Sequence, residues 1–346
     1  MYSRLLLIPL VSALVLCSAC SRTSDERDSR EPYEAIELEG RWLFDPESPE
    51  LEEWQILVEP RGIELTPYDD LIIADGDGSR LVRITPDGEL VEVIGRRGEG
   101  PGEFQKPYDV SFCPGTDVLW VFDSESTRIS RMRVSEHSTI YLDSFNVSPM
   151  ITFAASTTNY AVVDEHSFLC AELRSEARMA HIDDNGETLS SFGDLFTIDR
   201  YNPDLKRMYN FGTMLPGEDR IWFIGQSDPL IEVYSKDYLL TDSRRIMTPE
   251  VETRDALEIG PMSTLTYFMT AVLSRDGESI FTWMMTDYDS LTACVYEIDL
   301  NSLSVVKCYR IRRVTREMAA DMAVVEGDDG ISFYWTNWLD GVEMAR

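Results

Sequence analysis

The three histidines of this chain are the first candidates for catalysis or metal binding, because imidazole is a general base and a common ligand of transition metals. They are His137, His166 and His181. The local pattern places two of them at turns and one at a strand end, with no shared position in the chain's repeat. No Gly-x-Ser-x-Gly motif accompanies them. We therefore predict no catalytic residue, no metal site and no cofactor.

An acidic loop, Asp75–Ser79, alternates carboxylates in the way that calcium prefers. The ninth and twelfth positions of a calcium loop would be Arg83 and Pro86, and neither can serve as the required ligand. Asp123 occupies the corresponding place in a second copy of the repeat. We interpret Asp75 as a turn residue whose carboxylate accepts hydrogen bonds from nearby backbone amides.

A glycine-rich loop with two cations, Arg96–Gly100, could in principle hold a phosphate group. It lacks the Lys-Ser/Thr ending of a nucleotide loop, and no helix follows to supply a dipole. We interpret it as a crossing between two sheets.

Asp75 and Asp123 belong to a unit that occurs twice between Asp70 and Val134. Each copy has short β-branched or aromatic runs separated by Gly, Asp and Pro, as expected of an antiparallel meander. The runs are Leu71–Asp75, Arg80–Ile84 and Leu90–Ile94 in the first copy, and Val118–Asp123, Arg128–Met132 and Ile140–Phe145 in the second.

The first copy and the loop that follows it resemble the NHL-type repeats of six-bladed β-propellers, particularly those of bacterial lipoproteins. The resemblance lies in the order of their parts, which is Asp, a short turn, Arg, an apolar strand, an Asp-Gly turn, Ile-Gly, Gly-Glu-Gly-Pro-Gly-Glu-Phe and Pro. The resemblance is clear over about sixty-five residues and implies an all-β, six-bladed β-propeller with four-stranded antiparallel blades. It does not imply a function, because one fold hosts many activities.

Turn signals continue at intervals of about fifty residues, which indicates stacked repeats. Turns between second and third strands fall near Gly76, Ser124, Arg174, Ser227, Tyr288 and Trp338. The sixth unit is one strand short, and closed rings avoid open sheet edges. Either Ile36–Phe44 or Trp54–Val58 can supply that strand, so an N-terminal strand would close the last blade. Deleting residues 33 to 60 should then unfold the domain, which we expect to span residues 34–346.

The composition excludes some partners. The chain of 346 residues has 62 acidic and 31 basic side chains and a net charge of −31. Such a surface repels nucleic-acid phosphates and anionic membranes. We expect no nucleic-acid partner and membrane contact through a lipid anchor only.

The first nineteen residues have the pattern of a lipoprotein-type signal peptide, with Arg4 before the apolar run Leu5–Leu16. The run is too short to span a bilayer. Leu-Cys-Ser-Ala-Cys resembles a lipobox with Cys20 as the acylated residue, although Cys17 stands where Leu is commonest and leaves plain secretion open. Ser21 is not the Asp that favours inner-membrane retention, so we predict the outer membrane of the cell envelope. Residues 20–33 are expected to form a disordered acidic tether.

Export permits disulfides. Cys294 and Cys308 lie at equal offsets from the turn at Asn301, which would place them opposite one another in a hairpin. We predict a possible disulfide there, the alternative being two small apolar side chains in contact. The sequence does not decide the state of Cys113 and Cys170.

Aromatic residues are dense late in the chain, and most alternate along strands as core residues do. Tyr288 and Trp338 fall at predicted turns on the same end of the ring, where exposed aromatics commonly anchor partners. We predict a monomeric binding or scaffold module for an unknown protein or small-molecule ligand. The alternative is a propeller hydrolase or lyase with a site in the central channel.

Overall fold

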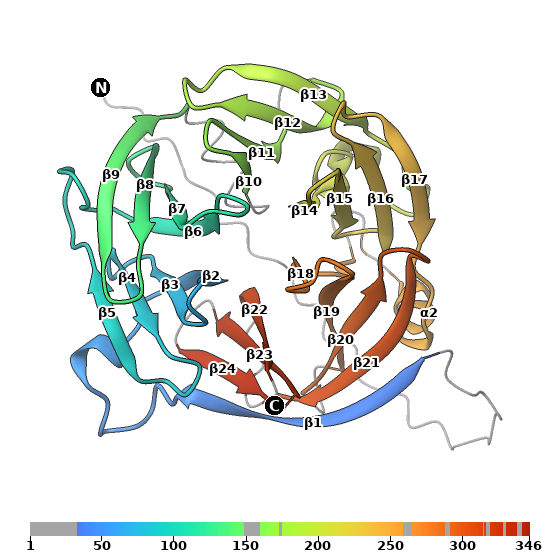
Figure 1. The fold of residues 1–346 in the computed structure, drawn as a ribbon. Helices are drawn as coiled ribbons and strands as arrows, with labels where there is room; N and C mark the ends of the chain where they lie inside the picture. The colour runs from blue at the N-terminus through green and yellow to red at the C-terminus, as the bar shows by residue number, and fades with distance from the viewer. Residues whose placement is uncertain are drawn as a thin grey trace, which may run out of the picture.

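The computed structural model describes residues 33–148, 160–172, 175–258, 260, 265–287, 291–313, 315, 319–327, 330–337 and 341–346. The described chain is nearly all β, and its sheets are arranged around a central axis as in a propeller (Figure 1).

Four sheets have four strands each, hydrogen-bonded in chain order and antiparallel throughout. The first contains β2 (Pro60–Leu65), β3 (Leu71–Asp75), β4 (Arg80–Ile84) and β5 (Leu90–Ile94). The second contains β6 (Pro107–Phe112), β7 (Val118–Asp123), β8 (Arg128–Val134) and β9 (Thr139–Asn146). The third contains β10 (Ala161–Asp164), β11 (Ser167–Ala171), β12 (Ala177–Asp183) and β13 (Thr188–Asp194). The fourth contains β14 (Gly212–Pro216), β15 (Arg220–Gly225), β16 (Leu230–Ser235) and β17 (Leu240–Arg245).

The remaining strands form one eight-stranded sheet in the order β18-β19-β20-β21-β1-β24-β23-β22. Its strands are β1 (Glu34–Phe44), β18 (Ala271–Leu273), β19 (Ser279–Asp287), β20 (Thr292–Asp299), β21 (Ser304–Arg312), β22 (Ala319–Gly327), β23 (Gly330–Asn337) and β24 (Val342–Ala345). We expected separate four-stranded sheets. Four of the sheets agree with this expectation, and the eight-stranded sheet does not.

Strand β1 is the cause of the difference, because it is hydrogen-bonded on two sides. Its first half, from Glu34 to Glu39, pairs in parallel with β21, and its second half, from Gly40 to Phe44, pairs antiparallel with β24. The second pairing is the expected contact between an N-terminal strand and the last three strands of the chain. Of the two candidate segments, the one around Ile36–Phe44 makes it, whereas Trp54 lies in the 3-10 turn η1 (Glu53–Gln55).

The turns follow the sequence pattern closely, because Gly, Asp and Ser determine them locally. Gly88 and Gly186 lie between the third and fourth strands of their sheets with φ angles of 88° and 78°, which favour glycine. Two longer insertions contain η2 (Pro203–Leu205), η3 (Met208–Asn210) and α2 (Pro249–Asp255). Among the described residues, no helix has the length and apolar character needed to cross a bilayer.

The core lies between successive sets of strands. One cluster packs Ile72 and Leu81 of the first sheet against Leu119 and Met132 of the second. Another packs Ile63 of β2 against strands near the C-terminus, and six such clusters follow one another around the ring. The late aromatic residues expected in the core are buried there, namely Tyr267, Phe268, Trp283, Tyr296, Tyr309, Phe333, Tyr334 and Trp335.

The innermost strands contact one another in sequence around the axis. Contacts join β2 to β6, β6 to β10, β10 to β14, β14 to β18, β18 to β22 and β22 back to β2. These six strands surround the centre of the ring (Figure 1). Side chains on them are therefore the ones that different sheets can bring together.

Candidate functional site

Three carboxylates lie on consecutive inner strands: Glu64 on β2, Asp109 on β6 and Asp321 on β22. Strand β2 contacts both β6 and β22, so it lies between them. We call Glu64, Asp109 and Asp321 the axial carboxylates. Each differs in what its oxygens contact, and that difference decides what the group can do.

Asp321 is a structural carboxylate that links strands on both of its sides. Its Oδ2 accepts a hydrogen bond of 3.1 Å from the backbone N–H of Ile63 on β2. Its Oδ1 accepts one of 2.9 Å from the hydroxyl of Thr270, which directly precedes β18. The side chain is almost completely buried. Asp321 therefore holds inner strands together from within the last strand set.

Asp109 makes the same kind of link in the second sheet, because its carboxylate also accepts a hydrogen bond from a neighbouring strand set. Its Oδ2 accepts a hydrogen bond of 3.0 Å from the backbone N–H of Tyr160, just before β10, and its Oδ1 accepts one of 2.9 Å from Val110 N–H. A Cβ atom at Gly62 would lie 2.9 Å from Asp109 Oδ1, so β2 approaches this carboxylate closely. Glycine at position 62 allows that approach.

Glu64 differs from the other two because no hydrogen bond to its carboxylate is present among the described residues. Glu64 and Gly62 are two positions apart on β2 and so share the face toward β6, while Ile63 points into the opposite core cluster. The Glu64 side chain is partly exposed. It is the axial carboxylate whose oxygens can accept a proton or bind a ligand.

Two of the axial carboxylates, Glu64 and Asp109, have raised pKa values. Burial is the largest cause of the raised pKa of Glu64, followed by the charges of Asp321 and Asp109. Burial and the charge of Asp321 raise the pKa of Asp109 to about 8, against the opposing effect of its two backbone donors. Clusters of this kind occur at functional sites but also in structural networks. The contacts of Asp109 and Asp321 are structural, which leaves Glu64 as the functional candidate.

The histidines do not join this site. His137 lies in the turn between β8 and β9, and His166 lies between β10 and β11, where its Nδ1 is 2.8 Å from Asp184 Oδ2. His181 lies on β12, and its Nδ1 is 2.6 Å from the hydroxyl of Tyr238. None of the three lies on an inner strand, which agrees with their lack of a shared position in the sequence repeat.

The interpretation of Asp75 and Asp123 as turn residues is confirmed. Asp75 Oδ1 accepts a hydrogen bond of 2.6 Å from Val58 N–H, and Asp123 accepts hydrogen bonds from four backbone amides, those of Gln105, Lys106, Glu125 and Ser126. Arg80 donates to Asp75, and its guanidinium also donates to the Ile56 carbonyl. The glycine-rich loop containing Arg96 crosses from β5 to β6, as expected.

The predicted hairpin register at Cys294 and Cys308 is wrong. The turn places Ile298 opposite Val305, one position off the predicted register, and a bulge between Glu297 and Ile298 adds a second position, so Cys294 lies opposite Arg310 and Cys308 lies opposite Tyr296. The sulfurs are therefore diagonal neighbours, and both thiols are free and buried in this structure. Cys113 and Cys170 are also free and buried.

Three other predicted site residues, Cys20, Tyr288 and Trp338, lie outside the described residues. The sequence analysis missed the axial carboxylates. Aligning Pro60–Leu65 with Pro107–Phe112 would have placed Asp109 at the position of Gly62, on an inner strand. Nothing in the local sequence shows that Asp321 contacts β2.

Comparisons with known proteins support the fold. No protein-family model and no curated protein matches this chain. A putative exported protein from Bacteroides fragilis is similar in structure, with a TM-score of 0.52 and 12% identity, over 90% of this chain and 98% of its own. A member of the DUF4221 family from Bacteroides vulgatus has a TM-score of 0.54 and 9% identity, over 85% of this chain and 93% of its own. Together with the sheet arrangement, these similarities identify the fold of the chain as propeller-like.

Proposed function

We propose that this chain is an exported, NHL-type, six-bladed β-propeller, anchored by a lipid at Cys20, which acts as a binding or scaffold module. The six-blade count is supported by the six inner strands in mutual contact and by the six core clusters between strand sets. Strand β1 accounts for the eight-stranded sheet, because it lies outside β21 and also completes the set β22-β23-β24.

Two further observations support the NHL type and export. The Asp75–Arg80 contact in the first sheet matches the pairing of Asp123 with Arg128 at the ends of β7 and β8 in the second. The signal-peptide pattern of residues 1–19, directly before Cys20, supports export, and the similar Bacteroides fragilis protein is described as a putative exported protein. Replacing Cys20 with Ala should abolish incorporation of labelled palmitate and move the protein from the detergent phase to the aqueous phase. Unchanged partitioning of the variant would contradict lipid anchoring.

The observation that carries the binding role is Glu64, a carboxylate on an inner strand without a hydrogen-bond partner among the described residues. Because Asp109 and Asp321 are occupied by backbone and hydroxyl donors, Glu64 would contact the ligand. A carboxylate of this kind suits a ligand that donates a hydrogen bond or carries an amine. Tyr288 and Trp338 would add contacts with a protein partner at one end of the ring.

Thermal-shift screening with matched amine-bearing and neutral compounds tests this role. We expect an amine-bearing ligand to raise the melting temperature of the wild type and to lose most of that effect with Glu64→Gln. Glu89→Gln changes an exposed carboxylate and is the matched control. A ligand that stabilises the wild type and Glu64→Gln equally would show that Glu64 is not the contact.

The raised pKa values of Glu64 and Asp109 favour one alternative, a hydrolase or lyase. A raised pKa favours the protonated form of a carboxyl group, and the protonated form can act as a general acid. Turnover of a bound ligand, lost with Glu64→Gln and retained with Glu89→Gln, would favour the enzyme. Binding without turnover favours the module.

A further inference from the structure

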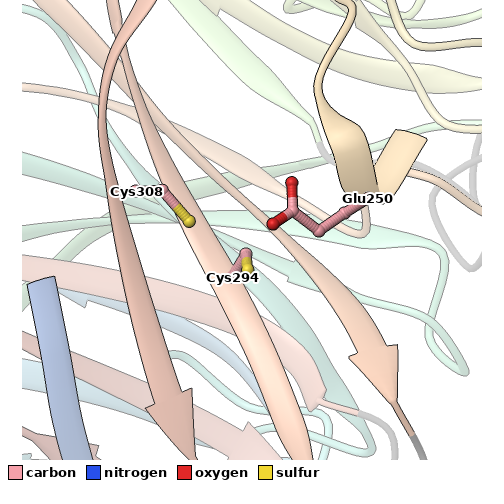
Figure 2. A group of neighbouring side chains, drawn as sticks. All are labelled: Glu250, Cys294 and Cys308. Carbon is pink, nitrogen blue, oxygen red and sulfur yellow. The ribbon is translucent and has the colours of Figure 1, made fainter. Parts of the chain in front are cut away.

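Two cysteines and a glutamate converge away from the axis. Cys294 is on β20, Cys308 is on β21, and Glu250 is at the start of α2 in the insertion between β17 and β18. Their two Sγ atoms and a carboxylate oxygen all lie within 4.8 Å of one another. Figure 2 shows the Cys308 sulfur and the Glu250 carboxylate directed toward one another, with Cys294 beside them. Both cysteines are almost completely inaccessible to solvent.

We propose that Glu250, Cys294 and Cys308 form a binding site for a thiophilic divalent metal ion, with Zn²⁺ as the first candidate. Thiolate and carboxylate are established zinc ligands, at about 2.3 Å and about 2.0–2.2 Å from the ion. Small side-chain rotations would bring three donors separated by up to 4.8 Å to such distances. The fourth position of a tetrahedral ion would be taken by an oxygen donor.

The surroundings of Glu250 orient it toward the cysteines. The hydroxyl groups of Tyr33 and Tyr296 donate to its Oε2 at 2.8 and 3.1 Å, and Arg310 donates to its Oε1 at 3.2 Å. Groups that hydrogen-bond to a ligand in this way fix its orientation at metal sites. Tyr33 immediately precedes β1, so the site connects the N-terminal strand, α2 and the hairpin of β20 and β21.

The charges balance with and without the metal. Without it, two neutral thiols accompany the ion pair of Glu250 and Arg310. On binding, the two S–H bonds break, two metal–sulfur bonds form, and two protons pass to the solvent. One divalent cation then replaces two protons, so the net charge of the buried cluster is unchanged. Burying a net charge costs free energy, and this cost is smaller when metal binding leaves the net charge of the cluster unchanged.

The position of the site suggests a structural role. The described part of the insertion containing α2 is joined to neighbouring strands by side-chain contacts such as that of Arg254 with the Met285 carbonyl, and a metal would link Glu250 directly to β20 and β21. Cys113 and Cys170 provide a contrast, because both are buried in another core cluster and, among the described residues, belong to no group of three potential metal ligands. They supply a matched control.

Metal analysis of the full chain, purified without chelator from zinc-supplemented medium, tests the proposal. We expect about one zinc per chain in the wild type and in Cys113→Ser/Cys170→Ser, and less than a tenth of that in Cys294→Ser/Cys308→Ser. Glu250→Gln should weaken zinc binding at least tenfold. Equal metal content in the wild type and in Cys294→Ser/Cys308→Ser would overturn the proposal.

Two measurements on the wild type test the proposal even if the variant Cys294→Ser/Cys308→Ser fails to fold. Titration with Cd²⁺ should produce the thiolate-to-metal absorption band with a one-to-one endpoint. In mild denaturant, bound zinc should protect Cys294 and Cys308 from alkylation but not Cys113 and Cys170. The absence of the band, or a Cys294–Cys308 disulfide found by mass spectrometry under non-reducing conditions, would overturn the proposal.

Discussion

The carboxylate of Asp321 accepts a hydrogen bond from the backbone N–H of Ile63, which is 258 positions earlier in the chain. The bond joins β22 to β2, where the last strand set meets the first sheet. Because both residues are buried, neither group can turn to water if the other is removed. The ends of the ring are therefore joined by a polar contact in addition to apolar packing.

Replacing Asp321 with Ala should destabilise the protein by about 1–3 kcal/mol, because the N–H of Ile63 would remain buried without an acceptor. Asp321→Asn keeps an acceptor oxygen and should cost less. Urea unfolding measures both, with Asp87→Ala as an exposed control expected to change stability by less than about 0.5 kcal/mol. Equal stability of Asp321→Ala and Asp321→Asn would show that this hydrogen bond contributes little.

Asp109 should make stability fall as pH rises. Its pKa is raised from an ordinary value of 3.8 to about 8, so the folded chain binds a proton that the unfolded chain releases between these values. The stabilisation is complete below about pH 4 and is lost as pH approaches 8, with a slope on the order of 1 kcal/mol per pH unit.

Comparison with Asp109→Asn isolates this contribution from that of other titrating groups. The unfolding free energy of the wild type minus that of the variant should decrease from pH 4 to pH 8. The measurement is a series of urea titrations across this range. A difference that stays constant, or increases with pH, would mean that Asp109 is ionised throughout.

Gly40 is the residue at which β1 passes from β21 to β24. A Cβ atom there would lie 2.8 Å from the Arg312 carbonyl oxygen and 2.9 Å from Glu343 Oε1. Gly40→Ala should therefore destabilise the protein by about 1–3 kcal/mol through overpacking. Gly327→Ala is the matched control, because its new Cβ would meet nothing within 4 Å. Thermal unfolding that ranks the two variants equally would contradict this account of Gly40.

Close to Gly40, Arg313 and Glu343 form an ion pair in which both side chains are inaccessible to solvent. The guanidinium donates to Glu343 Oε2 through two nitrogens, at 2.9 and 2.7 Å, and to Asn337 Oδ1 at 2.7 Å. Arg313→Met would leave the Glu343 charge buried and should cost about 3–5 kcal/mol.

The exposed pair of Arg220 and Asp219 provides the comparison, since such pairs contribute about 0–1 kcal/mol. Arg220→Met should change the unfolding free energy by a small fraction of the effect of Arg313→Met. If Arg313→Met/Glu343→Leu recovered none of the lost stability, the cost would come from packing and not from the unpaired charge.

The sequence predicted the features that depend on neighbouring residues. Strand runs such as Leu71–Asp75 follow from β-branched residues, and the hydrogen bonds that Asp123 accepts from the amides of Glu125 and Ser126 follow from turn chemistry within a few positions. Such local information was sufficient to locate most strands.

Contacts between distant segments could not be predicted in the same way. The parallel pairing of β1 with β21 needs no particular side chains, because backbone groups make it. The bulge after Glu297 changed the register at Cys294, and no turn residue marks it. Asp321 and Glu250 meet their partners only because the ring brings together segments that the repeat does not relate.

Strand β1 should be indispensable, because it supplies backbone hydrogen bonds to both β21 and β24 and its residue Phe44 packs in the core beside β2. Deleting residues 33–44 would expose two sheet edges and remove the second partner of β24. We expect loss of cooperative thermal unfolding, measured by circular dichroism, and aggregation on gel filtration. Deleting residues 22–32, the polar segment before Tyr33, is the control and should leave the melting temperature within a few degrees of the wild type. A soluble chain without residues 33–44 that melts cooperatively at the wild-type temperature would show that the ring closes without this strand.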